Sequence, residues 1–570
     1  MANFDVVKRI VDKKIKYYNS DKNLIQEFDT PNYHSNLKPG EYCFINTSTK
    51  LAAAIFSCEY DKHYSVANDM LRKIVSLQCK SGDNSGLWPY FLEETIEEMV
   101  EPDHNFADFN AYPMLYILKE HKDKLDKKLY EDIKNACILA CEAIIRRNLT
   151  ILYTNPTVMG IYCTVVCGEI FDIDDFVEYG RNKLDKFYFR IMNNGTYDEY
   201  NCPGYSMLIA NIYSLMLRHI EDSDMHNKVS KLNHIVWKML GEHYHNDLDE
   251  FTGPNLRQYV NFSDTVDLKT AAGLEENGEE LLSLVYKTEC PNDILPLFNQ
   301  KGKSTDFTRL VSTGYIYPYF GHPMVDTQHI RPRYTLGSMS MNDCWNQRRN
   351  VVAYIGDKEK KVCIRLRAYH DGYDFCSAFT STAQQGNVAL SLTNFHTDRG
   401  DTHVNLDMVK DATIKANKLS VLYQIEANCK GIIENIITEK TDKGYKLNIL
   451  GTKVEIKFPF IEATDLNPHF NISANDKEML VEAVLYSGKE IDIHLNKVES
   501  LAVVSAISIE RYINASVQIT KDELITANLN TNESLLTVKG PYKPLKQVHS
   551  ILLNEVLIDG ENIVEFAEAN

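Results

Sequence analysis

The sequence predicts an α+β multidomain protein in which a helical half precedes an antiparallel β half. Three observations support this fold class: a length of 570 residues, helix-period hydrophobicity in the first half, and strand-period alternation in the second. A chain of this length exceeds what one hydrophobic core usually serves. We therefore expect a helical domain at residues 1–304 and a β domain at residues 305–570.

In the first half, apolar residues recur three and four positions apart. Examples are Leu51, Ala54, Ile55 and Cys58, then Ile133, Ala136, Cys137, Ala140, Cys141 and Ile144, then Leu208, Ile212, Leu215 and Met216. This spacing places an apolar stripe along one side of a helix. Polar joins at 80–86, 121–127 and 193–203 separate the stripes. Successive helices with short joins predict a helical array.

In the second half, apolar residues alternate with polar ones. The alternating sets are Val362, Ile364, Leu366 and Ala368, then Val421, Tyr423 and Ile425, then Val454, Ile456 and Phe458. Gly, Asn and Asp turns separate these runs, which is typical of antiparallel strands. Runs of helices followed by runs of strands argue against a βαβ fold.

Composition limits the classes of partner. With 61 Lys and Arg against 79 Asp and Glu, the formal net charge is −18, which argues against a nucleic-acid-binding protein. The sequence shows neither a signal peptide nor an apolar run of membrane-spanning length, so no membrane partner is expected. Thirteen scattered cysteines favour a reducing compartment, and we expect a cytoplasmic protein. The sequence leaves open whether the protein forms a homo-oligomer.

The segment 193–205, NNGTYDEYNCPGY, is the densest group of residues that could carry chemistry. It crowds Tyr, Asn and acidic residues into a Gly/Pro loop directly before a predicted helix at 206–218. Loops at helix starts often present functional groups, and a polar, aromatic loop suits a sugar ligand. The alternative is an ordinary capped helix start with Tyr rings packed on the core.

Residues 194–205 resemble the "DG-x-(aromatic)-x-EG-x-GY" segment of heparinase II/III-like polysaccharide lyases, whose closing Tyr is catalytic. Residues 153–169 resemble the helix of that family whose leading Asn contacts the substrate carboxylate. The resemblance implies an α/α toroid, an incomplete barrel of helical hairpins, followed by an antiparallel β-sandwich. It also implies β-elimination on a uronic-acid-containing glycan. The resemblance implies that no cofactor is required. The sequence does not decide whether the protein holds a structural divalent metal.

The resemblance implies that Tyr205 is the catalytic base and acid and that Asn155 neutralises the carboxylate. That family often carries an HxHxD stretch early in its β domain. This chain offers 321–329 and 395–403 instead, and neither is a clean match. We assign the remaining catalytic role to His322 or His329.

The chemistry of β-elimination explains these residue types. The proton beside a carboxylate is weakly acidic, so donors or cations must neutralise the carboxylate before a base removes that proton. A Tyr hydroxyl, whose ordinary pKa is about 10, needs nearby donors or positive charge to act as the base.

Other residues are candidates for contacts with an acidic glycan. Aromatic rings could stack on sugars, and amides or guanidinium groups could bind hydroxyls and carboxylates. The substrate-binding candidates are Trp88, Asn105, Tyr153, Tyr197, Glu199, Arg257, Tyr259, Trp345 and Arg348. We expect Arg257 and one or more of Arg331, Arg333, Arg348 and Arg349 to line a locally positive cleft. The alternatives are aromatic packing and an interdomain seam of ion pairs.

Two alternatives to lyase chemistry remain at this stage, and metal sites are also considered. A glycoside hydrolase could use Asp198 or Glu199 with Asp103 or Asp108. A noncatalytic glycan-binding protein could share the fold. A metal at His243, His245 and Asp247 matches no strong zinc spacing, and the Cys pairs at 137/141 and 163/167 are better explained as buried packing residues.

Overall fold

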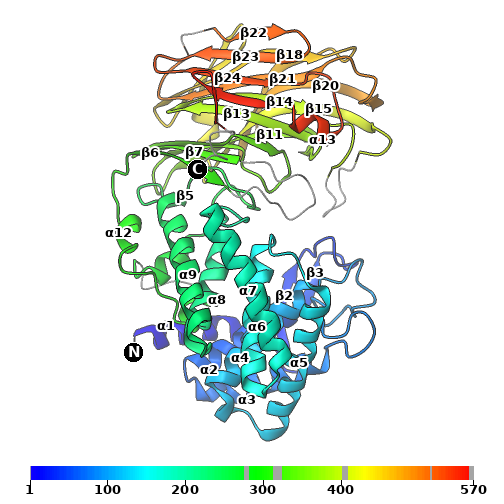
Figure 1. Cartoon of the computed structure of the whole chain (residues 1–570), viewed down its shortest axis with the longest axis vertical. Helices are drawn as coiled ribbons and strands as arrows, with labels where there is room; N and C mark the ends of the chain where they lie inside the picture. The colour runs from blue at the N-terminus through cyan, green and yellow to red at the C-terminus, as the bar shows by residue number, and fades with distance from the viewer. Residues whose placement is uncertain (1, 275–281, 312–323, 401–408, 514–515, 564–570) are drawn as a thin grey trace. The chain divides into compact units, whose positions relative to one another are not determined.

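The structure is a computed structural model that describes residues 2–274, 282–311, 324–400, 409–513 and 516–563. Helices fill the first half and antiparallel strands the second (Figure 1), so the predicted fold class is confirmed.

The described residues form two compact units by their contacts. The first unit contains residues 1–193, 204–238 and 265–295, and the second contains residues 194–203, 239–264 and 296–570. Two segments of the helical half therefore group with the β half. The single boundary at 304/305 stays a prediction.

The α-helices in chain order are α1 Ala2–Lys14, α2 Ile45–Ser57, α3 Tyr64–Ser76, α4 Asn105–Glu120, α5 Lys127–Arg147, α6 Thr154–Phe171, α7 Asp174–Asn194, α8 Pro203–His219, α9 Ser223–His243, α10 Val266–Ala271, α11 Leu282–Val285, α12 Leu295–Phe298 and α13 Gln547–Ile551. A small antiparallel sheet of β1 Tyr18–Asn19, β2 Leu24–Asp29 and β3 Gly40–Phe44 precedes α2.

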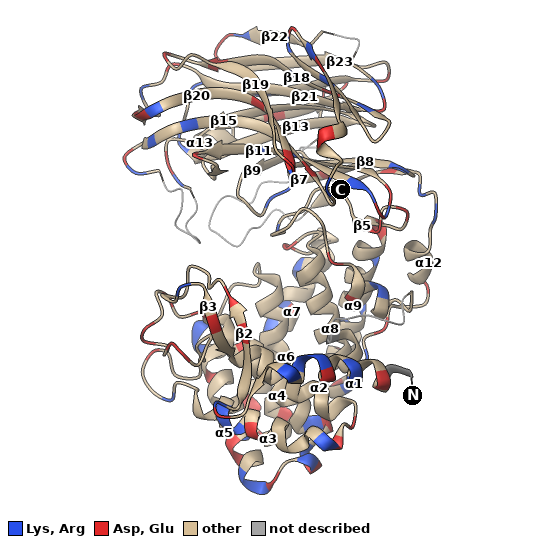
Figure 2. Ribbon diagram, turned by 180° about the vertical axis from the view of Figure 1, so that it is seen from behind, with Lys and Arg blue, Asp and Glu red and all other residues tan. Residues whose placement is uncertain are grey.

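The helices of the first unit differ in burial. In α6 every residue from Thr154 to Gly168 is buried, and α2, α4 and α8 are also buried over most of their length. By contrast, α3, α5 and α7 are amphipathic, and α7 buries only a stripe from Phe176 to Ile191. A helix that is apolar all round belongs inside, and an amphipathic one covers it. Figure 2 agrees, because α6 is nearly free of charged residues whereas α5 carries many.

Contacts fix the directions of α4, α5 and α6. The Cys141 thiol on α5 contacts the carbonyl oxygen of Cys163 on α6 at 3.4 Å, and Ile144 faces Gly160. Higher numbers on α5 therefore meet lower numbers on α6, which makes the two helices antiparallel. Arg147 at the end of α5 bonds Asn105 at the start of α4. It follows that α4 and α6 are parallel.

The direction of α8 follows from its neighbours. Lys228 of α9 contacts Asp185 of α7 at 2.6 Å, and Lys231 bonds the Tyr188 hydroxyl, so α9 and α7 are parallel. Only residues 220–222 join α8 to α9, and such a short loop reverses the chain. Because α7 also runs antiparallel to α6, helices α4, α6 and α8 start at the same end of the first unit.

The second unit contains stacked antiparallel sheets. In sheet order, the first comprises β19 His469–Ala474, β20 Glu478–His494, β15 Thr413–Ala427, β11 Lys361–His370, β10 Val351–Gly356, β8 Tyr334–Met339, β7 Met324–Arg331 and β6 Thr305–Val311, with β12 Tyr373–Asp374 beside β11. The second comprises β16 Ile437–Thr441, β17 Gly444–Ile449, β18 Thr452–Ala463, β21 Leu501–Ile509, β14 Val388–Phe395, β13 Ala378–Gln385 and β9 Met341–Asp343.

Further strands form a third sheet of β22 Gln518–Lys521, β23 Ile525–Asn530, β24 Leu535–Gly540, β25 Glu555–Ile558 and β26 Glu561–Asn562, and a ribbon of β4 Tyr244–His245 and β5 Glu250–Phe251. The second sheet lies between the other two, because its alternate residues enter different cores. Val503 packs with Ile364 of the first sheet, whereas Val504 packs with Ile525 of the third. The predicted sandwich therefore has an additional layer.

We predict that Gly180→Ala destabilises the protein by about 1–3 kcal/mol despite the better helix propensity of Ala. A Cβ at Gly180 would lie 2.5 Å from Val165 Cγ2 and 2.7 Å from Thr164 Oγ1, so α7 would have to move away from α6. Urea denaturation measures the change. Asn182→Ala, on the exposed side of α7, is the control and should stay within about 0.5 kcal/mol. Equal stability of both variants would contradict the close helix contact.

Candidate active site

Several sequence-predicted site residues lie at one end of the first unit. Asn105 begins α4, Asn155 lies in the first turn of α6, and Tyr205 lies in the first turn of α8. Tyr153 occupies the N-cap position of α6 and makes no side-chain capping bond there. Because these three helices are parallel, residues 50 or more positions apart in the chain share one end of the helical unit.

Local sequence explains why the helices begin there. Pro203 opens α8 and Pro156 lies in the first turn of α6, where a missing backbone N–H costs no helical hydrogen bond. Before α4, the Asp103 carboxylate accepts a hydrogen bond from the backbone N–H of Asn105 at 2.9 Å. These helix starts are therefore encoded locally.

The same end is electrostatically suited to an anion. The first N–H groups of each helix lack partners within the helix, and parallel helices add their positive dipole ends. Arg147 also reaches this end and donates to Asn105 Oδ1 at 2.8 Å. Asn155 is buried, and Tyr205 is half-buried. A local field that favours carboxylates can therefore exist in a protein of net charge −18.

In the second unit, the loop 194–203 is held by a buried network at Tyr200. The Tyr200 hydroxyl donates to Asp326 Oδ2 at 2.5 Å, and His243 Nε2 lies 3.0 Å from that hydroxyl and 3.1 Å from the same carboxylate oxygen. His243 Nδ1 lies 2.8 Å from the Met239 carbonyl oxygen, which can only accept, so Nδ1 carries a proton. Burial, reinforced by Asp326, raises the pKa of Tyr200 well above its ordinary value. Tyr200 is therefore a poor base.

Asn201 ties the same loop to the chain that follows β5. Its side-chain amide donates to the carbonyl oxygens of Thr252 and Pro254, each at 3.0 Å. Its backbone φ of 46° is left-handed, a conformation that Asn tolerates better than most residues. The loop is thus positioned by side-chain chemistry rather than by a regular sheet or helix.

Four predicted substrate-binding residues form one cluster in the second unit. Arg257 pairs with Glu199 at 3.0 Å, with both side chains buried, and its Nε donates to Gln347. The guanidinium groups of Arg257 and Arg348 lie 5.9 and 5.2 Å from the centre of the Trp345 ring. Arg348 contacts the Asp343 carboxylate at 3.2 Å.

Most of the arginines that we expected to line a positive cleft have partners in the protein. Arg257 and Arg348 each have a carboxylate partner in the second unit, and Arg331 pairs with Asp306 at 2.9 Å. Arg349 is fully buried and donates to backbone carbonyl oxygens. Positive charge on these groups is therefore largely balanced or enclosed in this structure.

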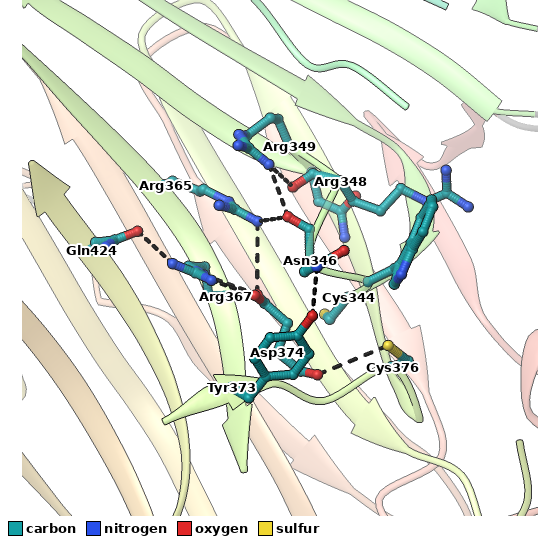
Figure 3. Close-up of polar contacts among 12 residues, drawn as sticks. Cys344, Asn346, Arg348, Arg349, Arg365, Arg367, Tyr373, Asp374, Cys376 and Gln424 are labelled. Atoms are coloured by element: carbon teal, nitrogen blue, oxygen red, sulfur yellow. Dashed lines mark hydrogen bonds and ion pairs between the residues drawn. The ribbon is translucent and has the colours of Figure 1, made fainter. Parts of the chain in front are cut away.

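Figure 3 shows how the loop that carries Trp345 is attached. Arg349 and Arg365 both donate to the Asn346 carbonyl oxygen, at 3.1 and 2.5 Å. Arg367 pairs with Asp374, and the Asn346 amide donates to the Tyr373 hydroxyl at 2.6 Å. A charge-assisted bond from Arg365 on β11 and the bond to Tyr373 on β12 thus hold this loop against the first sheet.

The remaining predicted residues lie in different environments. Trp88 is fully buried and its indole N–H donates to the Ile74 carbonyl oxygen at 2.9 Å, so its ring offers no open face for stacking. Tyr197 is also fully buried, whereas Tyr259 is 63% exposed. His329 contacts Asp306 at 2.8 Å, and burial lowers its pKa. His322 lies outside the described residues.

The alternative residues have structural partners. Asp103 accepts from the Tyr90 hydroxyl at 2.7 Å, and Asp247 accepts from the backbone N–H of Gly302. His245 lies 2.9 Å from the Arg331 carbonyl oxygen, apart from the network of His243. Within the described ranges, no group of three or more His, Cys, Asp or Glu residues could hold a metal ion. Nor does any helix there have the length and hydropathy to cross a membrane.

Sequence reasoning missed the Tyr200, His243 and Asp326 network. Asp326 is itself fully buried in β7, although the strand sequence MVDTQHIR is too polar to reveal that burial. A buried carboxylate requires partners, so a polar contact follows only once that burial is known. Here the partner on α9 is 83 residues away.

Comparison with known proteins gives limited matches. The family described as "Domain of unknown function (DUF8769)" matches residues 52–272. No curated protein matches the sequence. Among solved structures, the chain is similar to the crystal structure of heparinase III, with 7% identity and a TM-score of 0.42 over 86% of this chain and 81% of that chain.

We predict that Glu199→Gln lowers the free energy of unfolding by about 3–5 kcal/mol, because it leaves Arg257 charged and buried without its partner. Chemical denaturation of the purified variant measures the loss. The control is Glu499→Gln, which breaks the exposed pair with Lys543 and should cost about 0–1 kcal/mol. A Glu199→Gln protein as stable as the control would mean that the pair does not hold the loop.

Proposed function

We propose that this protein cleaves a uronic-acid-containing glycan by β-elimination. The observation that carries the proposal is the placement of Asn155 and Tyr205 in the first turns of two parallel helices at one end of the helical unit. The resemblance of residues 153–169 and 194–205 to the motifs of heparinase II/III-like lyases supports the same assignment.

In this mechanism the substrate carboxylate lies at the helix starts. The Asn155 amide donates to it, and the positive helix ends lower the energy of the negative charge that develops on it. The proton on the carbon beside the carboxylate thereby becomes more acidic. Asn155 is a suitable donor because it is buried, where a hydrogen bond to an anion is strong.

Tyr205 serves both proton transfers. Its phenolate removes the proton beside the carboxylate, and the released electron pair forms a carbon–carbon double bond while the adjacent glycosidic C–O bond breaks. The phenol then returns its proton to the leaving oxygen, so Tyr205 ends as it began. We assign stabilisation of the phenolate to His322 or His329, since a hydrogen bond donated to the ionised form lowers the pKa of a phenol.

The predicted substrate residues divide into two roles in this proposal. Asn105, Tyr153 and Tyr259 contact the glycan. We assign structural roles to Glu199, Arg257, Trp345 and Arg348, which contact one another or neighbouring groups within the second unit, and to the buried Trp88 and Tyr197.

We predict that Tyr205→Phe lowers turnover by at least about 10²- to 10⁴-fold, because one hydroxyl serves as both base and acid. Turnover is measured as near-ultraviolet absorbance of the unsaturated product from acidic oligosaccharides. Stability should change by only about 1 kcal/mol, the net value of one hydrogen bond. Tyr188→Phe on α7 is the control and should keep full activity. Near wild-type elimination by Tyr205→Phe would refute the assignment of the base.

We predict that Asn155→Ala lowers turnover by roughly 10²- to 10³-fold, the usual loss on removing one donor from a developing negative charge. Asn155→Asp should be at least as impaired, because it places a like charge beside the substrate carboxylate. Steady-state kinetics on the same oligosaccharides provide the measurement. If Asn155→Asp retained activity, Asn155 could not be the group that neutralises the carboxylate.

A further inference from the structure

A small cavity lies among α4, α5, α6 and α7 of the first unit. Its volume is about 20 Å³, enough for a single water-sized group. Gly160 of α6 forms part of its wall, and the polar residues that line it are His104, Asp108, Arg147, Thr157, Tyr179 and Lys183. Neighbours of Asn105 and Asn155 line it, which places it at the same end of the unit as the helix starts.

Asp108 is the least expected residue of this cavity. Its side chain is buried, and Oδ1 has no hydrogen-bond partner among the residues that the structure describes. Burial raises the pKa of Asp108 to about 8, although Arg147 opposes the rise. The carboxyl group is therefore mostly protonated at neutral pH, and it can donate a hydrogen bond into the cavity.

The other polar groups give the cavity a positive character. Arg147 uses Nη1 to bond Asn105, and Lys183 Nζ bonds Asn148 Oδ1 at 3.0 Å and the Leu149 carbonyl oxygen at 2.6 Å. Burial lowers the pKa of Lys183 and of His104. Two cationic side chains and a neutral acid, together with the starts of α4 and α6, favour an anion and disfavour a metal cation.

We propose that this cavity binds one oxygen of a carboxylate group, with the Asp108 hydroxyl and the Arg147 guanidinium as donors. The small volume favours a planar carboxylate, which can insert one oxygen and leave the other outside. Assignment of the carboxylate to an acidic sugar rests on the proposed function, whereas carboxylate binding itself does not.

The cavity lies next to the proposed catalytic residues along the chain, because its wall residues Pro156 and Thr157 follow Asn155 directly and His104 precedes Asn105.

The test is a calorimetric titration of the full-length protein with formate, acetate and glucuronate, which measures the affinity for each ligand. Gly160→Ala is the most informative variant, because it places a methyl group in the cavity and leaves every charge unchanged. That Cβ would lie 3.1 Å from Ile144 Cγ2 and 3.4 Å from Asp108 Oδ1. We expect at least a tenfold loss of affinity for all three ligands. Glu142→Ala, exposed on α5, should bind as the wild type does.

The dependence on pH separates the role of Asp108 from that of the cations. Above about pH 8, Asp108 ionises and repels a carboxylate, so affinity should fall as pH rises through that value. Loss of the Lys183 or His104 proton would act in the same direction, while Tyr179 stays neutral because burial raises its pKa. Asp108→Asn keeps a donor without the acid, so it should bind formate with a much weaker pH dependence.

The outcomes distinguish this inference from the proposed function. Formate binding that Gly160→Ala abolishes supports the cavity site, even if no acidic glycan is cleaved. Binding of formate without glucuronate would support a site for free small acids and contradict its use for sugars. Absence of binding to the wild type, or unchanged affinity in Gly160→Ala, would overturn the inference even if Tyr205 proves catalytic.

Discussion

Burial of helices on all sides is the constraint on which the helical unit depends. Because α6 is apolar around its circumference, amphipathic helices must cover it, and alternate helices of the chain then run in the same direction. Parallel directions bring the starts of α4, α6 and α8 together. The same packing that removes apolar surface from water therefore gathers helix N-termini, Asn155 and Tyr205 at one end.

The second unit depends on buried polar contacts where the first depends on apolar ones. Tyr200, His243 and Asp326 satisfy one another in a region without solvent, and Glu199 neutralises Arg257. Such pairs add little net stability but are costly to break, so they favour one conformation of loop 194–203. The loop leads directly into α8, and the first turn of α8 carries Tyr205.

Much of the architecture could be predicted from local patterns, because the spacing of apolar residues indicates which face of a helix or strand is buried. Ile133, Cys137 and Cys141 are buried on α5 as their spacing indicates, and Val454 and Ile456 enter the core of the sandwich. The third sheet was not foreseen, since β21 is buried on both faces and its sequence shows no alternation. Buried networks such as that of Asp326 join distant segments, and no local pattern specifies such partners.

The bond cleavage itself gives the most direct test of the account. Incubation of acidic oligosaccharides in water enriched in heavy oxygen, followed by mass spectrometry of the products, shows whether solvent oxygen enters the new chain ends. Elimination forms a double bond and adds no water, so the account predicts unlabelled products whose masses sum to that of the substrate. Incorporation of one heavy oxygen per cleavage would demonstrate hydrolysis and contradict the assignment of Tyr205 and Asn155 to β-elimination.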